Sequence, residues 1–448
     1  MTASLARAPD RRSARRSIRR LWRHVRRRLY RAAHPLRQRG AQWLRRRITP
    51  YLPDLAAFFG ALLCAGLAAL LTGALAGCGG GVGSEGTGSV ASGSFASGTI
   101  SGYGSIIVNG VHFDETQALV QGDDGQTLAA STLALGMVVQ VTGGPISLAV
   151  DGSSRAVASA VRTQRALVGP VSARTLNLSA GTAQLTVLGQ TVQIGADTVF
   201  DARMAGGLAA VTVGQWLEVY GFYDSTAARF AATRIAPSTA SAGSRVSGPV
   251  MALDAQAQTF TLGTQTYSFA ALGQPPAADA RVTLKLQSAP DGNGRWVVNG
   301  QQAGEAPPQE RDGAGVDGLV SAVLSASRFV VDGVTVDAST AGVSGNVQVG
   351  AQVEVRGTLR AGVLLASQVE ATAGKVKTFE LNGSPASLDT VNRRFVLRGT
   401  TVSYATATVV FVNGSAARLV GYAGKLKVEG GLSADRTLLE ATRIMFDN

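Results

Sequence analysis

Cysteine and histidine are scarce in this chain, which has 2 Cys and 3 His among 448 residues. Cys64 lies inside a long apolar run and Cys78 at its end, so no pair remains beyond that point to form a disulfide. Only His112 follows Cys78, and a zinc site or a Cys/His pair cannot be assembled from one histidine without a free cysteine. The stability of that part must come from packing.

A serine triad would have to recruit His112, and no nucleophile elbow surrounds it. The simpler interpretation makes His112 a half-buried strand residue beside Phe113. We therefore expect no catalytic residues, no metal ligands and no cofactor, and we do not expect an enzyme.

Positive charge is also scarce beyond the first 50 residues. Residues 1–50 hold 17 Arg, no Lys and one acid, which gives them +16 and leaves −3 for residues 51–448, since the whole chain carries +13. Without Asp54, the part after Cys78 carries −2. Binding of nucleic acid needs a basic groove with stacking aromatics, so we do not expect nucleic acid as a partner of this part.

The Arg-rich leader, residues 1–54, predicts an amphipathic helix over 11–33 with an apolar stripe and a basic face. Such a helix beside a membrane segment favours contact with anionic lipid on the cytoplasmic side. An Arg-rich arm that binds nucleic acid is the alternative. Because 54 residues are long for a leader, a translation start near Leu36 or Leu44 also stays open.

An uncharged run of 23 residues, 55–77, is long enough to cross a hydrocarbon core of about 30 Å as a helix. It ends in Leu75, Ala76, Gly77 and Cys78, followed by three glycines. This box resembles the bacterial lipoprotein signal, and the resemblance implies that Cys78 carries the lipid after cleavage. An uncleaved transmembrane helix over 55–77 is the alternative.

Both interpretations place the chain in a bacterial cell envelope, held by membrane lipid through Cys78 acylation or through the 55–77 helix. Gly79 follows Cys78, and resemblance to sorting rules favours the outer membrane or a periplasm-facing position over the inner membrane. Residues 78–97 are mostly Gly, Ser, Ala and Thr, a composition that predicts a flexible tether.

The rest of the chain repeats itself. A hairpin of alternating apolar residues with a turn glycine recurs at residues 106–113, 185–192, 260–263, 329–336 and 395–402. Its Asn-Gly and Asp-Gly turns tolerate the positive φ of a type I′ turn. A glycine precedes each copy: Gly98, Gly169, Gly248, Gly318 and Gly383.

Two further signatures follow the hairpin. A strand bounded by glycines recurs at residues 136–143, 214–221 and 350–357. The unit closes on Ala-Ser/Thr-x-Val/Ile at residues 158–161, 232–235, 366–369 and 441–444, and the third unit lacks this closing strand.

Each unit of about 70 residues predicts five or six short strands with almost no helical period. Closing so small a sheet into a barrel removes its exposed edges. We predict an all-β array of five small barrels in series, in which neighbours share surface. The predicted units are residues 98–167, 168–240, 246–303, 316–374 and 378–448.

The repeat resembles the bacterial family called domain of unknown function 5666, most clearly over Gly98–Asp114 and Leu135–Val139. The resemblance covers nearly all of residues 97–448 and is weakest in the third unit. It implies OB-like barrels, similar to the oligonucleotide/oligosaccharide-binding fold and often found in exported lipoproteins. It carries no site residues.

Three other patterns are candidate sites. Asp291-Gly-Asn-Gly294 resembles the start of a calcium loop, but Gln302 stands where the bidentate Glu belongs, so we predict a turn. Asp123-Asp124-Gly125 predicts a hairpin tip. The densest aromatic patch predicts either core packing or a face that binds sugar or peptide: Trp216, Tyr220, Phe222 and Tyr223.

Two classes of function remain. The favoured one is a non-enzymatic envelope lipoprotein that scaffolds or binds an envelope protein or polysaccharide. The other is oligonucleotide or oligosaccharide binding through the OB-like faces.

Overall fold

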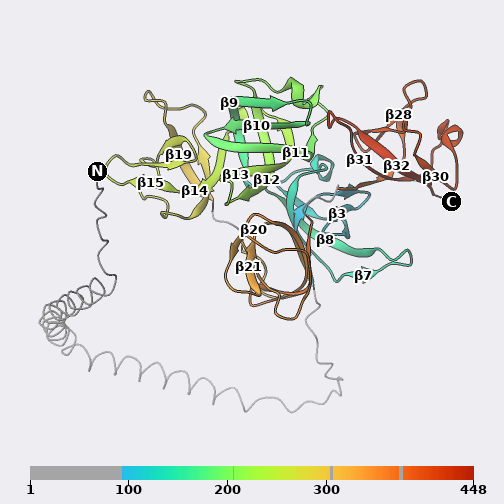
Figure 1. Cartoon of the computed structure of the whole chain (residues 1–448), viewed down its shortest axis with the longest axis horizontal. Helices are drawn as coiled ribbons and strands as arrows, with labels where there is room; N and C mark the ends of the chain where they lie inside the picture. Colours follow the sequence, from blue (N-terminus) through green and yellow to red (C-terminus); the bar gives the residue numbers. More distant parts are fainter. Residues whose placement is uncertain (1–92, 205, 303–305, 373–376, 448) are drawn as a thin grey trace, which may run out of the picture. The chain divides into compact units, whose positions relative to one another are not determined.

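The computed structural model describes residues 93–204, 206–302, 306–372 and 377–447, which form one compact unit built of strands (Figure 1). Four 3₁₀ turns interrupt them: η3 (Ala130–Thr132), η4 (Gly207–Ala210), η5 (Ala240–Ala242) and η6 (Ala416–Leu419). The all-β prediction is confirmed. Among these described residues, no helix has the length and apolar character needed to span a bilayer. The leader, the 55–77 run and Cys78 lie outside them.

Barrel 2 displays the plan of all five barrels. It consists of β9 (Leu167–Asn177), β10 (Thr182–Val187), β11 (Gln190–Phe200), β12 (Trp216–Asp224) and β13 (Arg229–Pro237). β9, β10 and β11 pair antiparallel in order, β11 pairs parallel with β13, and β12 pairs antiparallel with both β13 and β9. The sheet therefore closes on itself in the order first, second, third, fifth, fourth, first.

Barrel 1 follows this plan with a divided first strand and an added short hairpin strand. Its strands are β1 (Ser94–Thr99), β2 (Gly102–Tyr103), β3 (Ile106–Val108), β4 (Val111–Asp114), β5 (Leu119–Gln121), β6 (Val138–Gly143), β7 (Ser147–Leu148) and β8 (Ser154–Thr163). Here β4 and β5 share the role of third strand, because both pair parallel with β8.

Barrels 4 and 5 repeat the pattern. Barrel 4 comprises β20 (Arg311–Val323), β21 (Arg328–Val331), β22 (Val334–Asp337), β23 (Gly342–Ser344), β24 (Gln352–Arg360) and β25 (Val363–Ala371). Barrel 5 comprises β26 (Phe379–Gly383), β27 (Ala386–Asp389), β28 (Arg394–Leu397), β29 (Thr400–Ser403), β30 (Val410–Val412), β31 (Leu426–Leu432) and β32 (Leu439–Phe446).

Barrel 3 corrects one prediction. It comprises β14 (Ser244–Pro249), β15 (Met251–Asp254), β16 (Thr259–Leu262), β17 (Gln265–Ser268), β18 (Arg281–Leu286) and β19 (Trp296–Gln302). β19 is the closing strand that the sequence did not reveal, and it pairs parallel with β17 and antiparallel with β18. Its alternating burial, with Trp296 and Val298 buried, closes the barrel without the Ala-Ser/Thr-x-Val/Ile signature.

The glycine signatures have a steric cause. Asn109 and Gly110 both have positive φ (53° and 69°), as the predicted type I′ turn requires. The turn folds back over the first strand, where a Cβ on Gly98 would lie 2.6 Å from Asn109 Oδ1. At the other end, Gly143 marks a bulge against β8, and a Cβ there would collide with the carbonyl oxygen of Val157. Gly221, Gly357 and Gly430 occupy the same bulge in barrels 2, 4 and 5.

The barrels are not joined only in sequence order, which corrects the prediction of an array in series. β1 pairs parallel with β20 of barrel 4, so that Phe95 lies opposite Ala314. β2 pairs parallel with β26 of barrel 5, with Tyr103 opposite Leu381. The first strand of barrel 1 therefore binds two barrels that follow it by more than 200 residues.

Apolar packing reinforces these joints. Phe95 is only 2% exposed and belongs to the buried cluster of barrel 4. Barrels 2 and 3 share one buried cluster, and barrels 1 and 5 share another. Tyr267 of barrel 3 donates its buried hydroxyl to the carbonyl oxygen of Leu188 in barrel 2 at 2.5 Å. The small barrels thus bury faces against one another that none could bury alone.

Candidate functional site

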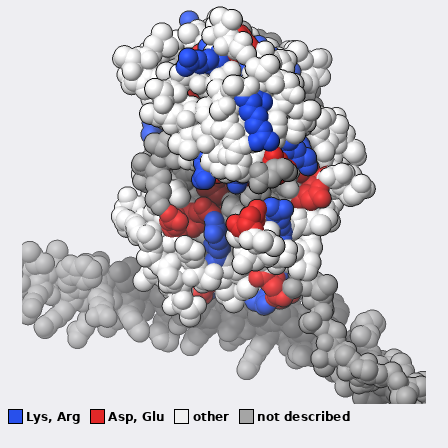
Figure 2. Space-filling view, turned by 90° about the vertical axis from the view of Figure 1, so that its right-hand side faces the viewer, with Lys and Arg blue, Asp and Glu red and all other residues white. Residues whose placement is uncertain are grey.

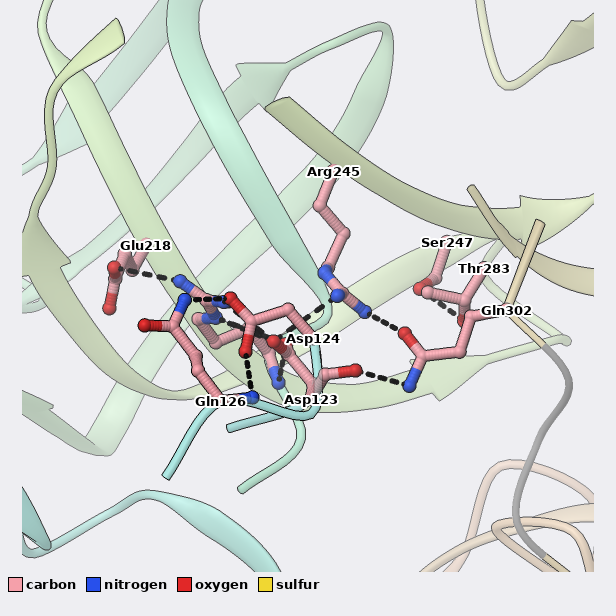
Figure 3. A network of polar contacts seen from close by, with 9 residues as sticks. Asp123, Asp124, Gln126, Glu218, Arg245, Ser247, Thr283 and Gln302 are labelled. Carbon is pink, nitrogen blue, oxygen red and sulfur yellow. Dashed lines mark hydrogen bonds and ion pairs between the residues drawn. The ribbon is translucent and has the colours of Figure 1, made fainter. Parts of the chain in front are cut away.

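A buried network of charges joins barrels 1, 2 and 3 (Figure 3). Its centre is Asp123, in the turn after β5, whose side chain is 5% exposed. The turn itself is the one predicted, because Gly125 donates its backbone N–H to the carbonyl oxygen of Gly122 at 3.0 Å. The sequence did not indicate that Asp123 is covered by two other barrels.

Arg165, in the segment that links barrels 1 and 2, supplies most of the donors to Asp123. Its guanidinium lies 2.5 Å from Asp123 Oδ1 and 3.0 Å from Oδ2, and its backbone N–H donates to Oδ2 at 3.1 Å. The same guanidinium donates to Glu218 Oε1 of barrel 2 at 3.2 Å. This side chain therefore fixes barrel 1 against barrel 2.

Arg245, on β14 of barrel 3, approaches Asp123 from the other side. Its guanidinium lies 3.2 Å from Asp123 Oδ1 and donates to Gln302 Oε1 at 2.6 Å. Gln302, on β19, donates its amide to the carbonyl oxygen of Asp123. Gln302, at the position where a calcium loop would have its bidentate Glu, therefore forms part of the contact between barrels 1 and 3.

The electrostatics follow from burial. Burial lowers the pKa of Arg165, but hydrogen bonding and charge from Asp123, together with Glu218, outweigh it and raise that pKa. For Arg245 burial dominates, and its pKa is lowered despite the nearby Asp123. Two guanidiniums thus share the Asp123 carboxylate, Glu218 supplies a second negative charge to Arg165, and each charge depends on the others for compensation.

A cleft of about 670 Å³ adjoins this network, lined by residues of barrels 1 to 4. Its wall mixes hydroxyl and amide groups with paired charges. Ser247 and Thr283 share a hydrogen bond of 2.9 Å. The guanidinium of Arg281 lies 3.2 Å from Asp332 of barrel 4 and 5.7 Å from the ring centre of Tyr223 in barrel 2. The cleft therefore offers donors, acceptors and one aromatic ring without a large field of one sign.

A second cavity, of about 390 Å³, lies among barrels 1, 2 and 5. Arg234 of β13 spans it, donating to the carbonyl oxygen of Leu135 at 3.0 Å and to Asp201 Oδ2 at 2.5 Å. Arg436 reaches from barrel 5 to the carbonyl oxygen of Gly181 in barrel 2, and burial lowers its pKa. Arg234 therefore connects barrel 2 to barrel 1, and Arg436 connects barrel 5 to barrel 2.

The predicted aromatic patch does not form one exposed face. Tyr220 and Phe222 are each 3% exposed and pack against Val138 of barrel 1 and Leu319 of barrel 4. They point outward from barrel 2, and neighbouring barrels cover most of their surface. Trp216 packs beside the core of barrels 2 and 3, and Tyr223 alone borders the cleft.

The remaining candidates have ordinary structural roles. His112 lies half-buried on β4, as predicted; burial lowers its pKa against the opposing charge of Glu380. Asp291 forms the predicted turn, with its carboxylate 3.0 Å from Arg295 Nε. Within the described ranges, no group of three His, Cys, Asp or Glu side chains is arranged to hold a metal ion. Cys78 and its box lie outside those ranges.

Sequence reasoning missed Asp123, Arg165 and Arg245 as structural partners. One signal was present. Three residues before the repeated first-strand glycine, barrels 3 and 5 have the charged residues Arg245 and Glu380, where barrels 1, 2 and 4 have Phe95, Ala166 and Gly315. A charged residue at a position that is apolar or small in three of the five barrels implies a partner of opposite charge, although nothing in the sequence identifies Asp123 as the partner of Arg245.

The profile of the family described as domain of unknown function (DUF5666) matches residues 168–236 and 317–370. These segments are barrel 2 and most of barrel 4, so the chain carries repeats of that family. The first repeat, which carries the clearest resemblance in sequence, lies outside the two matched segments.

No curated protein matches the chain. Among solved structures, it is similar to one described as drosophila Unr CSD456, with 12% sequence identity and a TM-score of 0.13. That similarity covers 47% of this chain and 98% of the other.

Proposed function

We propose that this chain, which carries DUF5666 repeats, is an exported, lipid-anchored and non-enzymatic binding protein of a bacterial envelope. Its five barrels form one body, and the 670 Å³ cleft among barrels 1 to 4 receives a neutral oligosaccharide. The observation that carries the proposal is the cleft itself, a concave site at the meeting of several modules, where ligands preferentially bind.

The composition of the cleft wall supports a neutral polar ligand. Arg165 and Arg245 are committed to Asp123, and Arg281 to Asp332. Hydroxyl groups such as those of Ser247 and Thr283 can act as both donors and acceptors. Lys and Arg side chains also lie close to Asp and Glu side chains on the face in Figure 2, with wide uncharged areas between them.

The strand order supports likening each barrel to the OB fold, a five-stranded Greek-key barrel that binds oligonucleotides and oligosaccharides. The anchoring part of the proposal is supported by the box at Leu75–Cys78 and the Gly/Ser-rich segment after it. Mass spectrometry of the purified membrane-fraction protein tests it: a chain that begins at acylated Cys78 is expected. An intact leader with a free thiol contradicts the anchor.

Binding is tested by calorimetry with chitohexaose and maltohexaose. We expect one of these sugars to bind with an affinity that changes little with salt, and Tyr223→Ala and Arg281→Ala to weaken binding about tenfold each. Arg155→Ala is the matched control, because it removes an exposed Arg–Asp pair outside the cleft. Failure of both variants to alter binding would place the sugar elsewhere.

Oligonucleotide binding is the second candidate, favoured by the four arginines on the cleft wall. The same titration with single-stranded DNA of about 12 nucleotides separates the two. Tight DNA binding that weakens steeply with salt would replace the oligosaccharide proposal, because release of counterions is the signature of phosphate contacts.

A further inference from the structure

Barrel 1 carries a hairpin between β6 and β8 whose apolar side chains are exposed. Leu148 is 76% exposed and Val150 fully exposed at its tip, Ile146 is 37% exposed, and Val157 on the opposite strand is 61% exposed. The hairpin is ordered by its own contacts, since Ala149 donates its backbone N–H to the carbonyl oxygen of Ser153 at 2.8 Å. Ile146 lies beside Gly313 of barrel 4, whereas Leu148 and Val150 form an exposed apolar tip.

The equivalent connections of the other barrels are polar or minimal. Barrel 2 has Ser225 and Thr226 at this place, barrel 4 turns through Ala361 and Gly362, and barrel 5 turns through residues 433–438. In barrel 3 the connection carries the capped turn at Asp291. The apolar tip is thus a property of barrel 1, which is the first barrel after the proposed anchor.

The described chain begins at the base of this same hairpin. Ser94 lies opposite Gly143 in the β1–β6 pair, and its hydroxyl donates to the carbonyl oxygen of Gly144 at 2.7 Å. Only 14 residues, 79–92, separate Cys78 from Gly93. At no more than about 3.6 Å per residue, 14 residues reach at most roughly 50 Å.

The hairpin is shorter than that limit. Val150 lies six positions after Gly144, which in an extended strand amounts to about 20 Å. An anchor at Cys78 therefore leaves the tip and the lipid within reach of each other. Asp151 and Arg155, the charged residues of the hairpin, form an ion pair of 2.7 Å, so the element has no net charge to hold it in water.

We propose that the tip of this hairpin, Leu148 to Val150, inserts into the boundary of the bilayer that holds Cys78. The inference rests on the proposed anchor and adds a second membrane contact, which orients barrel 1 on the surface. Exposed aliphatic side chains enter the region between headgroups and acyl chains because burial there removes them from water. The occupant is lipid, since the tip is convex and offers no groove to a protein segment.

The test uses the full acylated protein bound to phosphatidylethanolamine/phosphatidylglycerol vesicles. Val150→Cys carries a nitrobenzoxadiazole label, and Val391→Cys is the matched control. Val391 is 89% exposed near the β27–β28 turn of barrel 5. We expect the label at 150 to shift its emission to shorter wavelength on vesicles and to be shielded from iodide, while the label at 391 responds to neither. Adding Leu148→Asp to Val150→Cys is expected to abolish the shift; both positions are exposed, so the barrel stays folded.

The parent protein reports on the anchor separately, because acylated Cys78 takes no label and a free Cys78 does. Labelling of the parent protein would show a free Cys78 and would contradict both the proposed anchor and the inference that rests on it. An unlabelled parent whose variant shows no shift at 150 defeats the inference alone. An equal shift at 391 also defeats it, because that result means general adhesion of the protein to lipid.

Discussion

Two of the joints that hold barrel 1 to its neighbours are built from different chemistry. The joint with barrel 4 is the parallel pair β1–β20 with Phe95 buried beside it. The joint with barrels 2 and 3 is the network around Asp123. Main-chain pairing tolerates many side chains because every residue offers the same donor and acceptor. A buried ion network tolerates almost none, because removing one charge leaves the others uncompensated.

The largest expected effect is at the ionic joint. Asp123→Ala leaves Arg165 and Arg245 buried without their shared carboxylate, and we expect it to lower the free energy of unfolding by about 3 to 5 kcal/mol. The free energy of unfolding of each variant, obtained by denaturant unfolding, measures this loss. Asp124→Ala is the control, since Asp124 lies 3.6 Å from Arg165 and is 22% exposed. Equal losses for both variants would show that the joint does not depend on Asp123 in particular.

The apolar joint should lose less. Phe95→Ala opens a cavity at the edge of barrel 4, and we expect a loss of about 3 kcal/mol. The main-chain bonds between β1 and β20 should survive, so the amides of Ala314 and Val316 should remain protected from hydrogen exchange. If that protection disappears, the side chain and not the strand pairing holds barrels 1 and 4 together.

The smallest effect concerns the joint with barrel 5, where His112 of β4 faces Glu380 and Lys427. Burial holds the pKa of His112 below its ordinary 6.5. The folded state thus binds fewer protons than the unfolded state, so stability is complete above pH 6.5 and falls as pH decreases through the folded pKa. His112→Asn should flatten the decrease of the unfolding midpoint between about pH 8 and pH 5. An unchanged pH profile would show that other groups cause it.

Much of each barrel could be predicted because its signals are local. The turn at Asn109-Gly110 needs positive φ within two residues, and the bulge at Gly143 needs a missing Cβ. Alternation of apolar residues marks which side of a strand faces its own barrel. These requirements recur in each unit, so five copies of the same pattern predict five copies of the same structure.

The candidate site was less accessible to sequence reasoning. Strand alternation identifies Tyr220 and Phe222 as aromatic residues on the outer side of their strand. It does not distinguish an outer side chain that faces solvent from one that faces another barrel, because both occupy the same alternate positions. Asp123 likewise matches an exposed turn. Its burial depends on Arg245, which lies 122 positions later, and no local pattern links the two.

The sequence by itself determined the strand alternation, the turns, the bulge glycines and the number of barrels, because each depends on residues that are near neighbours along the chain. Tertiary structure alone decided that β1 pairs with β20, that Asp123 is enclosed by two arginines, and that four barrels surround a cleft. The physical reason is that contacts between barrels depend on the shape and charge of whole faces. Those faces exist only after each barrel has closed.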